Sequence, residues 1–322
     1  MEQKYCSRPR FSVIVPIYGV EKYIAECAES LFSQTYDNIQ FIFVNDGTKD
    51  ASMQILGDLI KTKYQDLESR IVIVNKENGG LPAARKTGME YAEGDYILHV
   101  DSDDWLETNA FELLAAEVEK TGSDIIYFDF YKEYRSYSKL DKEREYSAAD
   151  RHRFISDMFN YNAYGYVWNK CTKRSLYENN VIYFPPYPMH EDIYLMSQLI
   201  CYAESISHLH KGLYHYRRTN PMSISSEHKK KRRKDSTMNL MDLYECFHDN
   251  IKGSPVETVE GEILTRAGWY SLVYGYGFYE KYPYLAERLS AIKVSTRYRI
   301  MILYQLILKL YVKGRCLFAK GR

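Results

Sequence analysis

Three carboxylates crowd the four-residue stretch Asp101-Ser-Asp-Asp104, directly after the strand-like run Tyr96–Val100. Carboxylates that lie close together repel one another, and they lose solvation energy when they are buried. A divalent cation with oxygen ligands, such as Mg²⁺ or Mn²⁺, is the simplest compensation, often together with the phosphates of a substrate. An acidic turn that faces solvent is the alternative, so the surrounding elements decide which interpretation holds.

The first 130 residues alternate segments typical of strands with segments typical of helices. Apolar residues at helical spacing, such as Ile24, Cys27 and Leu31, mark the helices. We expect strands at residues 11–17, 39–44, 71–74, 96–100 and 124–130. We expect helices after the first two strands, from Pro82 to near Gly94, and at 107–120, with Thr48 or Asp50 capping the second. This order predicts a mostly parallel sheet with helices on both faces.

Four junctions should meet at the carboxyl edge of that sheet, where open α/β sheets bind their ligands. They are residues 16–19, 45–49, 75–82 and 101–104. The first turn, PIYGVEKY, has a single glycine, which excludes the G-x-G-x-x-G loop of dinucleotide enzymes, and no G-x-x-x-x-G-K-[ST] loop occurs anywhere. If phosphate binds here, a metal must supply the positive charge.

The composition of the 322 residues is that of a globular protein, with a formal net charge of zero, and it argues against a protein built to bind nucleic acid. The six cysteines are scattered, as reduced thiols of an intracellular protein are. We find neither a signal-peptide pattern nor a run of about 18 apolar residues that would span a membrane. We therefore expect a cytoplasmic protein.

Taken together, the junctions resemble those of inverting glycosyltransferases of family 2, which have the GT-A fold. The resemblance covers about residues 9–220 and lies in FSVIVPIYGVEKYI, SLFSQTY, FIFVNDGTKDAS, NKENGGLPAARKTGMEYAEGDYILHVDSDDW and HEDIYL. It implies a nucleotide-sugar donor, most often a UDP-sugar, and Mn²⁺ or Mg²⁺ as cofactor. It also implies transfer of a sugar, with inversion, to a hydroxyl of a glycan or lipid-linked acceptor in cell-surface polysaccharide synthesis.

By this resemblance, Asp101 and Asp103 form a D-x-D motif that contacts ribose and metal, and Asp192 of the HED segment is the base that takes the proton of the acceptor hydroxyl. The residues assigned to nucleotide-sugar binding are Pro16, Tyr18, Glu21, Asn45, Asp46, Arg85, Asp101 and Ser102. The chain departs from the family pattern at Asn45, where an Asp is usual, and at Gly19, where an Asn is usual. Asn can still donate and accept hydrogen bonds, so the first change loosens the assignment of the base contact.

Each of these sites has a structural alternative. Asp104 can cap the following helix. Glu191 and Asp192 can simply open the helix at 193–202, since acids favour helix N-termini. Arg85 can be a surface cation of its helix.

Acceptor contacts are the least specific predictions. Trp168, with Tyr166 beside it, can stack on a sugar ring, but burial in the core is at least as well supported. Glu191 is a second weak acceptor candidate. His208, His210 and His215 alternate along one segment, and there we favour structural or exposed histidines over a metal cluster.

We place a domain boundary near residue 225. Residues 1–225 form the expected catalytic domain, with a nucleotide-sugar half at about 9–130 and an acceptor half at 131–225; residues 226–322 form a basic helical extension. Nine Lys or Arg and no Asp or Glu occur from Arg288 to Arg322, around the apolar stretch Ile300–Val312. This tail suits either an anionic membrane surface or packing onto the catalytic domain.

The sequence thus favours a metal-dependent glycosyltransferase that works on the cytoplasmic face of the cell membrane. Two other hypotheses stay open: a catalytically silent glycan-binding or scaffold protein on the same fold, and a sugar nucleotidyltransferase, which also needs metal-binding carboxylates and would release pyrophosphate.

Overall fold

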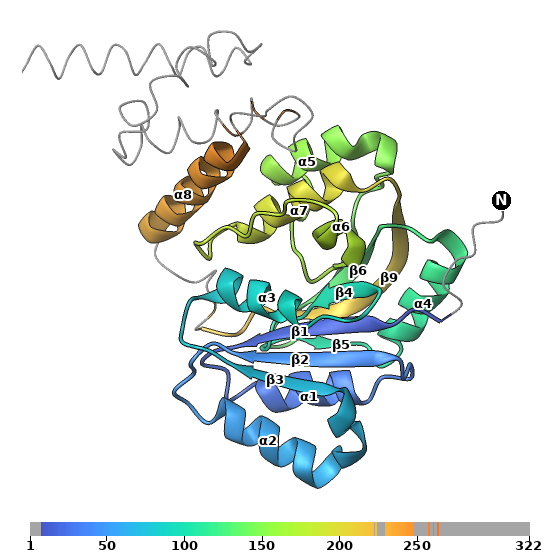
Figure 1. The fold of residues 1–322 in the computed structure, drawn as a ribbon, viewed down its shortest axis with the longest axis vertical. Coiled ribbons are helices and arrows are strands. Elements are labelled where there is room, and N and C mark those ends of the chain that lie inside the picture. Colours follow the sequence, from blue (N-terminus) through green and yellow to red (C-terminus); the bar gives the residue numbers. More distant parts are fainter. Residues whose placement is uncertain are drawn as a thin grey trace, which may run out of the picture. The chain divides into compact units, whose positions relative to one another are not determined.

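Figure 1 shows the computed structural model, which describes residues 8–221, 223, 229–247, 257, 260 and 263. The chain divides into two compact units, Met1–Glu227 and His228–Arg322. Of the C-terminal extension, helix α8 (Lys229–Phe247) is described, whereas the basic tail from Arg288 and the stretch Ile300–Val312 lie outside the described residues. Among the described helices, none is long and apolar enough to cross a membrane.

The first four strands form the parallel half of one sheet, in the order β3-β2-β1-β4. The strands are β1 (Phe11–Ile17), β2 (Ile39–Asn45), β3 (Ile71–Asn75) and β4 (Tyr96–His99). All seven residues of β1 are buried, as expected for a central parallel strand that is covered on both faces. These strands confirm the parallel part of the predicted fold.

Helices cover both faces of this half, as predicted (Figure 1). They are α1 (Ile24–Phe32), α2 (Ser52–Lys63), α3 (Leu81–Glu90) and α4 (Ala110–Thr121). Alternate residues of β1 serve the two faces: Val13 and Val15 belong to the core cluster that contains Leu31 of α1, whereas Ile14 packs with Ala84 of α3. The sheet is therefore the middle of a three-layer unit.

Three helix boundaries differ from the prediction. Helix α3 ends at Glu90 rather than near Gly94. Gly94 lies beyond the helix and passes so close to β1 that a Cβ there would lie 2.5 Å from the backbone nitrogen of Ser12. Helix α2 has Ala51 as its N-cap, although the Asp50 carboxylate accepts a hydrogen bond from the Ser52 N–H at 3.1 Å. Helix α4 begins at Ala110 rather than at Glu107, because a turn at Thr108 and Asn109 precedes it.

The second half of the unit completes the sheet, in the order β4-β8-β6-β9-β5. Its strands are β5 (Trp105–Leu106), β6 (Ile125–Glu133), β7 (Ser138–Asp141), β8 (Lys170–Lys173) and β9 (Ile206–Arg217). The remaining elements are η1 (Gln65–Arg70), η2 (Ala148–Asp150), α5 (Arg151–Phe159), α6 (Arg174–Glu178) and α7 (Glu191–Tyr202). Strand β8 is antiparallel to β4 and β6, whereas β9 is parallel to β6. The result is a mixed α/β sheet whose last long strand, β9, reaches the carboxyl edge of β4.

Candidate active site

The acidic stretch lies at the carboxyl edge of the parallel strands, directly after β4. Asp104 is fully buried there, and both of its carboxylate oxygens are hydrogen-bonded to β9. One oxygen accepts a hydrogen bond from the Tyr214 hydroxyl at 2.8 Å, and the other accepts one from the Arg217 backbone N–H at 2.7 Å. The prediction that Asp104 caps the following helix is therefore wrong: Asn109 is the N-cap of α4, and Asp104 anchors a strand instead.

Asp103 is half-buried and also bound to the end of β9. Its carboxylate accepts a hydrogen bond from the Asn220 side chain at 2.7 Å, and its carbonyl oxygen accepts one from Arg217 Nε at 2.7 Å. Burial, with the nearby charge of Asp101, raises the pKa of the Asp103 carboxyl. Sequence reasoning missed Tyr214, Arg217 and Asn220 as site residues, although an Arg pair at the end of a strand was a usable signal.

The acidic stretch offers two carboxylates, those of Asp101 and Asp103, to a hard divalent cation. Burial, and then the neighbouring acids Asp103 and Asp101, raise the pKa of Asp104 well above its usual value, and a cation bound beside these acids would relieve their mutual repulsion. Asp101 and Asp103 are the two that keep part of their surface exposed. Their oxygens are the donor type that Mg²⁺ and Mn²⁺ prefer.

Arg85 connects the acidic stretch to helix α7. Its guanidinium is 2% exposed, and it donates one hydrogen bond to Asp101 Oδ1 at 2.7 Å and another to the buried Glu191 carboxylate. Arg85 is therefore not the surface cation of the structural alternative. Among the described residues, Arg85 Nε and Glu191 Oε2 are buried without a hydrogen-bond partner.

Asp192 lies in the first turn of α7, next to Glu191. Burial is the main cause that raises the pKa of its carboxyl to about 6; the Ile193 N–H and the positive charge of Arg85 oppose this, and the charge of Asp101 adds to it. The electrostatic influence of Asp101 and Arg85 places Asp192 in the same neighbourhood as the acidic stretch. A carboxylate with a pKa near 6 suits proton transfer at neutral pH.

Asn45 and Asp46, at the end of β2, hold the adjacent loops. The buried Asp46 carboxylate accepts hydrogen bonds from the Gly79 and Gly80 N–H groups at 2.9 and 2.8 Å, and it pairs with Lys76 at 2.6 Å. Asn45 accepts the Thr48 N–H at 3.0 Å and donates to the Asn75 side chain at 2.9 Å. These contacts position the loop at 75–82, and a base contact would be an additional role for either residue.

The other predicted donor residues lie along the same edge. Pro16 is buried near the end of β1, and Tyr18 is 56% exposed just beyond it. Glu21 is exposed and accepts a hydrogen bond from the Ala51 N–H at 3.0 Å, while Ser102 is buried within the acidic stretch.

The weak acceptor candidate Trp168 is 3% exposed and stacks on Tyr166 and Tyr214, with ring centroids 4.5 and 4.2 Å apart. This burial favours the core role over contact with a sugar. The three histidines of β9 are not one cluster. His215 lies apart from the other two, stacked on Trp105 and Tyr131 and paired with Glu107 and Glu133.

Comparison with known proteins identifies the family. The sequence matches the model of glycosyl transferase family 2 over residues 12–184, which is more than half of the chain, and the chain belongs to that family. It is 35% identical to the uncharacterized glycosyltransferase EpsJ of Bacillus subtilis over 223 residues, which cover 67% of this chain and 63% of EpsJ. The chain thus matches less than two thirds of that relative's length.

Two solved structures share the fold. TarS of S. aureus in complex with UDP-GlcNAc has a TM-score of 0.61 and 22% identity, covering 85% of this chain and 76% of that one. The mannosyltransferase PcManGT of Pyrobaculum calidifontis, in complex with GDP-Man and Mn²⁺, has a TM-score of 0.53 and 16% identity, covering 96% and 83%. At these identities the likeness concerns the fold alone.

Proposed function

We propose that this protein transfers a sugar, with inversion, from a nucleotide-sugar donor of the UDP-sugar class to a hydroxyl of a glycan or lipid-linked acceptor in polysaccharide synthesis. The observation that carries the proposal is the bridge made by Arg85, whose one guanidinium contacts both Asp101 and Glu191. It joins an acidic stretch suited to a metal and a diphosphate to helix α7, whose second residue, Asp192, has a carboxyl of raised pKa. Family membership and the fold shared with TarS support the same function.

In this mechanism Asp101 and Asp103 would hold Mn²⁺ or Mg²⁺, and the bound ion would stabilise the negative charge on the departing diphosphate. Asp192 accepts the proton of the acceptor hydroxyl on its carboxylate. The acceptor oxygen then forms a bond to the anomeric carbon while the bond from that carbon to the phosphate oxygen breaks. Because attack comes from the face opposite the leaving group, the anomeric configuration inverts.

Two positioning roles follow from the contacts. Asp46 fixes the 75–82 loop through two backbone N–H groups, which would keep one wall of the donor site in place. Arg85 holds Asp101 and Glu191 at a fixed separation, so that the metal-binding stretch and the base cannot drift apart.

The test is turnover of a panel of UDP- and GDP-sugars with Mn²⁺, with nucleoside diphosphate release as the readout. We expect release of UDP from at least one donor, and Asp103→Ala should abolish the metal-dependent part. A parallel assay supplies a nucleoside triphosphate and a sugar 1-phosphate; release of pyrophosphate there, without release of a nucleoside diphosphate from any sugar donor, would instead identify a nucleotidyltransferase. Binding without turnover across donors and glycan acceptors would support the silent glycan-binding protein.

We further propose that the protein works on the cytoplasmic face of the membrane, as a peripheral protein held by its basic tail. The charge of residues 288–322 supports this, since each Lys or Arg near an anionic surface contributes about 1 kcal/mol. The full chain should sediment with anionic vesicles, and a chain truncated before Arg288 should not. Equal sedimentation of both would contradict the proposal.

A further inference from the structure

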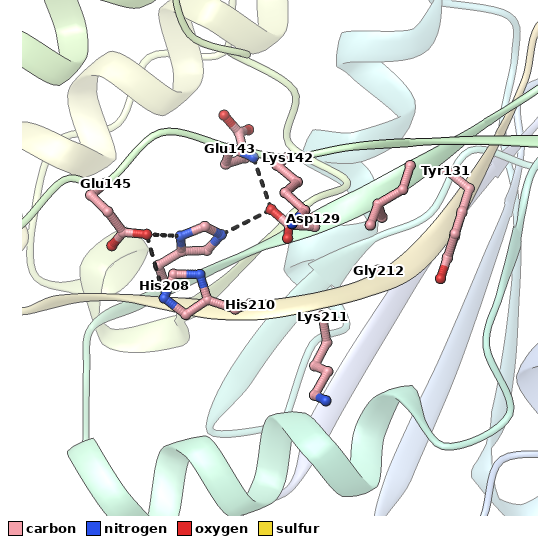
Figure 2. A pocket seen from close by; sticks show the side chains of 10 residues that line it. Asp129, Tyr131, Lys142, Glu143, Glu145, His208, His210, Lys211 and Gly212 are labelled. Atoms are coloured by element: carbon pink, nitrogen blue, oxygen red, sulfur yellow. Dashed lines mark hydrogen bonds and ion pairs between the residues drawn. The ribbon is translucent and has the colours of Figure 1, made fainter.

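A second polar cluster lies in the first half of β9, away from the acidic stretch. It lines a cavity of about 420 Å³ formed by β6, β7, β9 and the residues after β7. Figure 2 shows the side chains of Glu145, His208 and His210 converging at one end of this cavity. One ligand atom from each of the three lies within 4.8 Å of the other two.

His208 is held between two carboxylates. Its side chain is 3% exposed, with Nδ1 2.6 Å from Glu145 Oε1 and Nε2 3.0 Å from Asp129 Oδ1. The ring also stacks on Tyr127, with centroids 4.5 Å apart and planes 11° apart. The orientation of the imidazole is therefore fixed before any ligand arrives.

Asp129 has the contacts of a residue that orients a metal ligand. It is buried, and the oxygen that faces His208 also accepts the Glu143 N–H at 2.8 Å. Metal-binding histidines commonly donate their second ring N–H to such a carboxylate, which fixes the tautomer. With the proton on Nε2 facing Asp129, the lone pair of Nδ1 points toward Glu145.

A bulge in β9 supplies the third group. Phe128 pairs with Leu209 and Asp129 with Gly212, so His210 and Lys211 stand outside the ladder. Bulges of this kind re-aim side chains. His210 Nε2 lies 3.4 Å from the same Glu145 oxygen, whereas Lys211 points away from the cluster (Figure 2).

We propose that Glu145, His208 and His210 bind one transition-metal ion of the zinc class, at a site separate from the donor site. Zinc bonds of about 2.0–2.2 Å in a tetrahedron put ligand atoms about 3.3–3.5 Å apart, which the His210–Glu145 pair already matches. Glu145 is 67% exposed, so its carboxylate can withdraw from His208 to that spacing. Two imidazoles and one carboxylate favour Zn²⁺ over Mg²⁺.

Such an ion would connect β9 to the chain segment that follows β7. Glu145 comes from that segment and both histidines come from β9. A bound ligand stabilises the folded form because it binds that form alone. Zinc should therefore raise the thermal midpoint of the protein without being needed for sugar transfer.

The experiment titrates Zn²⁺ alone into the full-length, chelator-treated protein by calorimetry, with Co²⁺ absorption as a report on the ligand geometry. We expect one equivalent of Zn²⁺ to bind, and an excess of Mg²⁺ should not displace it. The donor-site variant Asp103→Ala should bind Zn²⁺ with the same affinity. His210→Ala and Glu145→Gln, both at exposed side chains, should weaken binding by at least about tenfold. The matched control is His152→Ala, at another exposed histidine, which should bind as the unchanged protein does.

Two further readouts separate a metal site from a network of ion pairs. The zinc-induced rise in thermal midpoint should vanish in His210→Ala, and D129N should weaken binding by about 10–100-fold. No saturable Zn²⁺ binding, displacement by Mg²⁺, or equal affinity in His210→Ala and His152→Ala would each overturn the proposal. None of these outcomes bears on turnover of UDP-sugars, so failure here is distinct from failure of the proposed function.

Discussion

Arg85 is buried between two carboxylates that come from different halves of the unit. It has Asp101 on one side and Glu191 on the other, 106 residues further along the chain. Removing one partner of a buried ion pair leaves the other charge uncompensated and costs more than the pair itself contributes. The stability of the unit and the geometry of its proposed site therefore depend on the same guanidinium.

We expect Arg85→Met to lower the free energy of unfolding by about 3 kcal/mol, because Glu191 is left charged and buried. Urea denaturation would measure this. Lys86→Met is the control, since Lys86 is exposed on the same helix. Addition of Glu191→Gln to Arg85→Met should recover part of the loss. Equal stability of the Arg85 and Lys86 variants would refute the role given to the bridge.

The raised pKa of Asp192 sets a pH dependence for the proposed transfer. Since a general base acts only when it is ionised, kcat/KM should rise as pH increases through about 6 and then level off. Asp192→Asn should lower kcat by about 10²–10⁴-fold and remove this rise. Asp66→Asn, at an exposed carboxylate, should keep both the rate and the profile. An unchanged profile in Asp192→Asn would exclude Asp192 as the base.

The residues of the candidate site could be located from the sequence, but the side chains that bind them could not. The acidic stretch could be found because it follows a strand-like run, and the HED segment could be found because it precedes a helix-like run. The bonds from Tyr214, Arg217 and Asn220 to Asp103 and Asp104 could not, since they span more than 100 residues. Likewise, the histidine cluster depends on a bulge in β9 that no local sequence pattern predicts.

At the scale of elements, the close contact between α3 and β1 is made possible by Gly88. A Cβ at this position would lie 2.3 Å from Ile14 Cγ2, far inside van der Waals contact. Helix α3 also carries Arg85, less than one turn before Gly88, so the depth at which this helix packs sets the position of the guanidinium.

We expect Gly88→Ala to destabilise the protein by about 1–3 kcal/mol, because overpacking outweighs the gain in helix propensity. Gly57→Ala in α2 is the matched control: no atom lies within 4 Å of its added Cβ, so it should stabilise by about 0.5–1 kcal/mol. Thermal or urea unfolding of both variants would measure the two effects. Stabilisation by both substitutions would show that α3 can move away from β1 at little cost.

The parallel half of the sheet was predictable from sequence, and the antiparallel half was less so. Apolar runs such as Ile39–Val44 identify strands that are buried on both faces whatever their partners are. Strand β8, with four residues, and β5, with two, are too short to produce a pattern, and their existence depends on the strands beside them. The edge that carries the candidate site was therefore predictable, whereas the short strands beside it were not.

For the whole unit, a donor and a metal should act together on stability. We expect UDP with Mn²⁺ to raise the thermal midpoint of the full chain more than either alone, because the ion and the phosphates compensate the same carboxylates. Asp103→Ala should remove the part that depends on Mn²⁺ and leave any rise caused by zinc at His208 and His210. Loss of both effects in Asp103→Ala would mean that a single site accounts for them.

The attachment of the acidic stretch to β9 also has a consequence for biosynthesis. Arg217 and Asn220 lie 114 and 117 residues after the Asp103 groups that they bind. At ribosomal rates of about 5–20 residues per second, these partners are synthesised on the order of 10 s after Asp103 and Asp104. A nascent chain halted before Tyr214 contains the parallel strands but lacks the β9 residues that bind the acidic stretch. That stretch should therefore stay accessible to proteases and chaperones. The edge of the sheet that carries the proposed site is therefore among the last parts of this unit to mature on the ribosome.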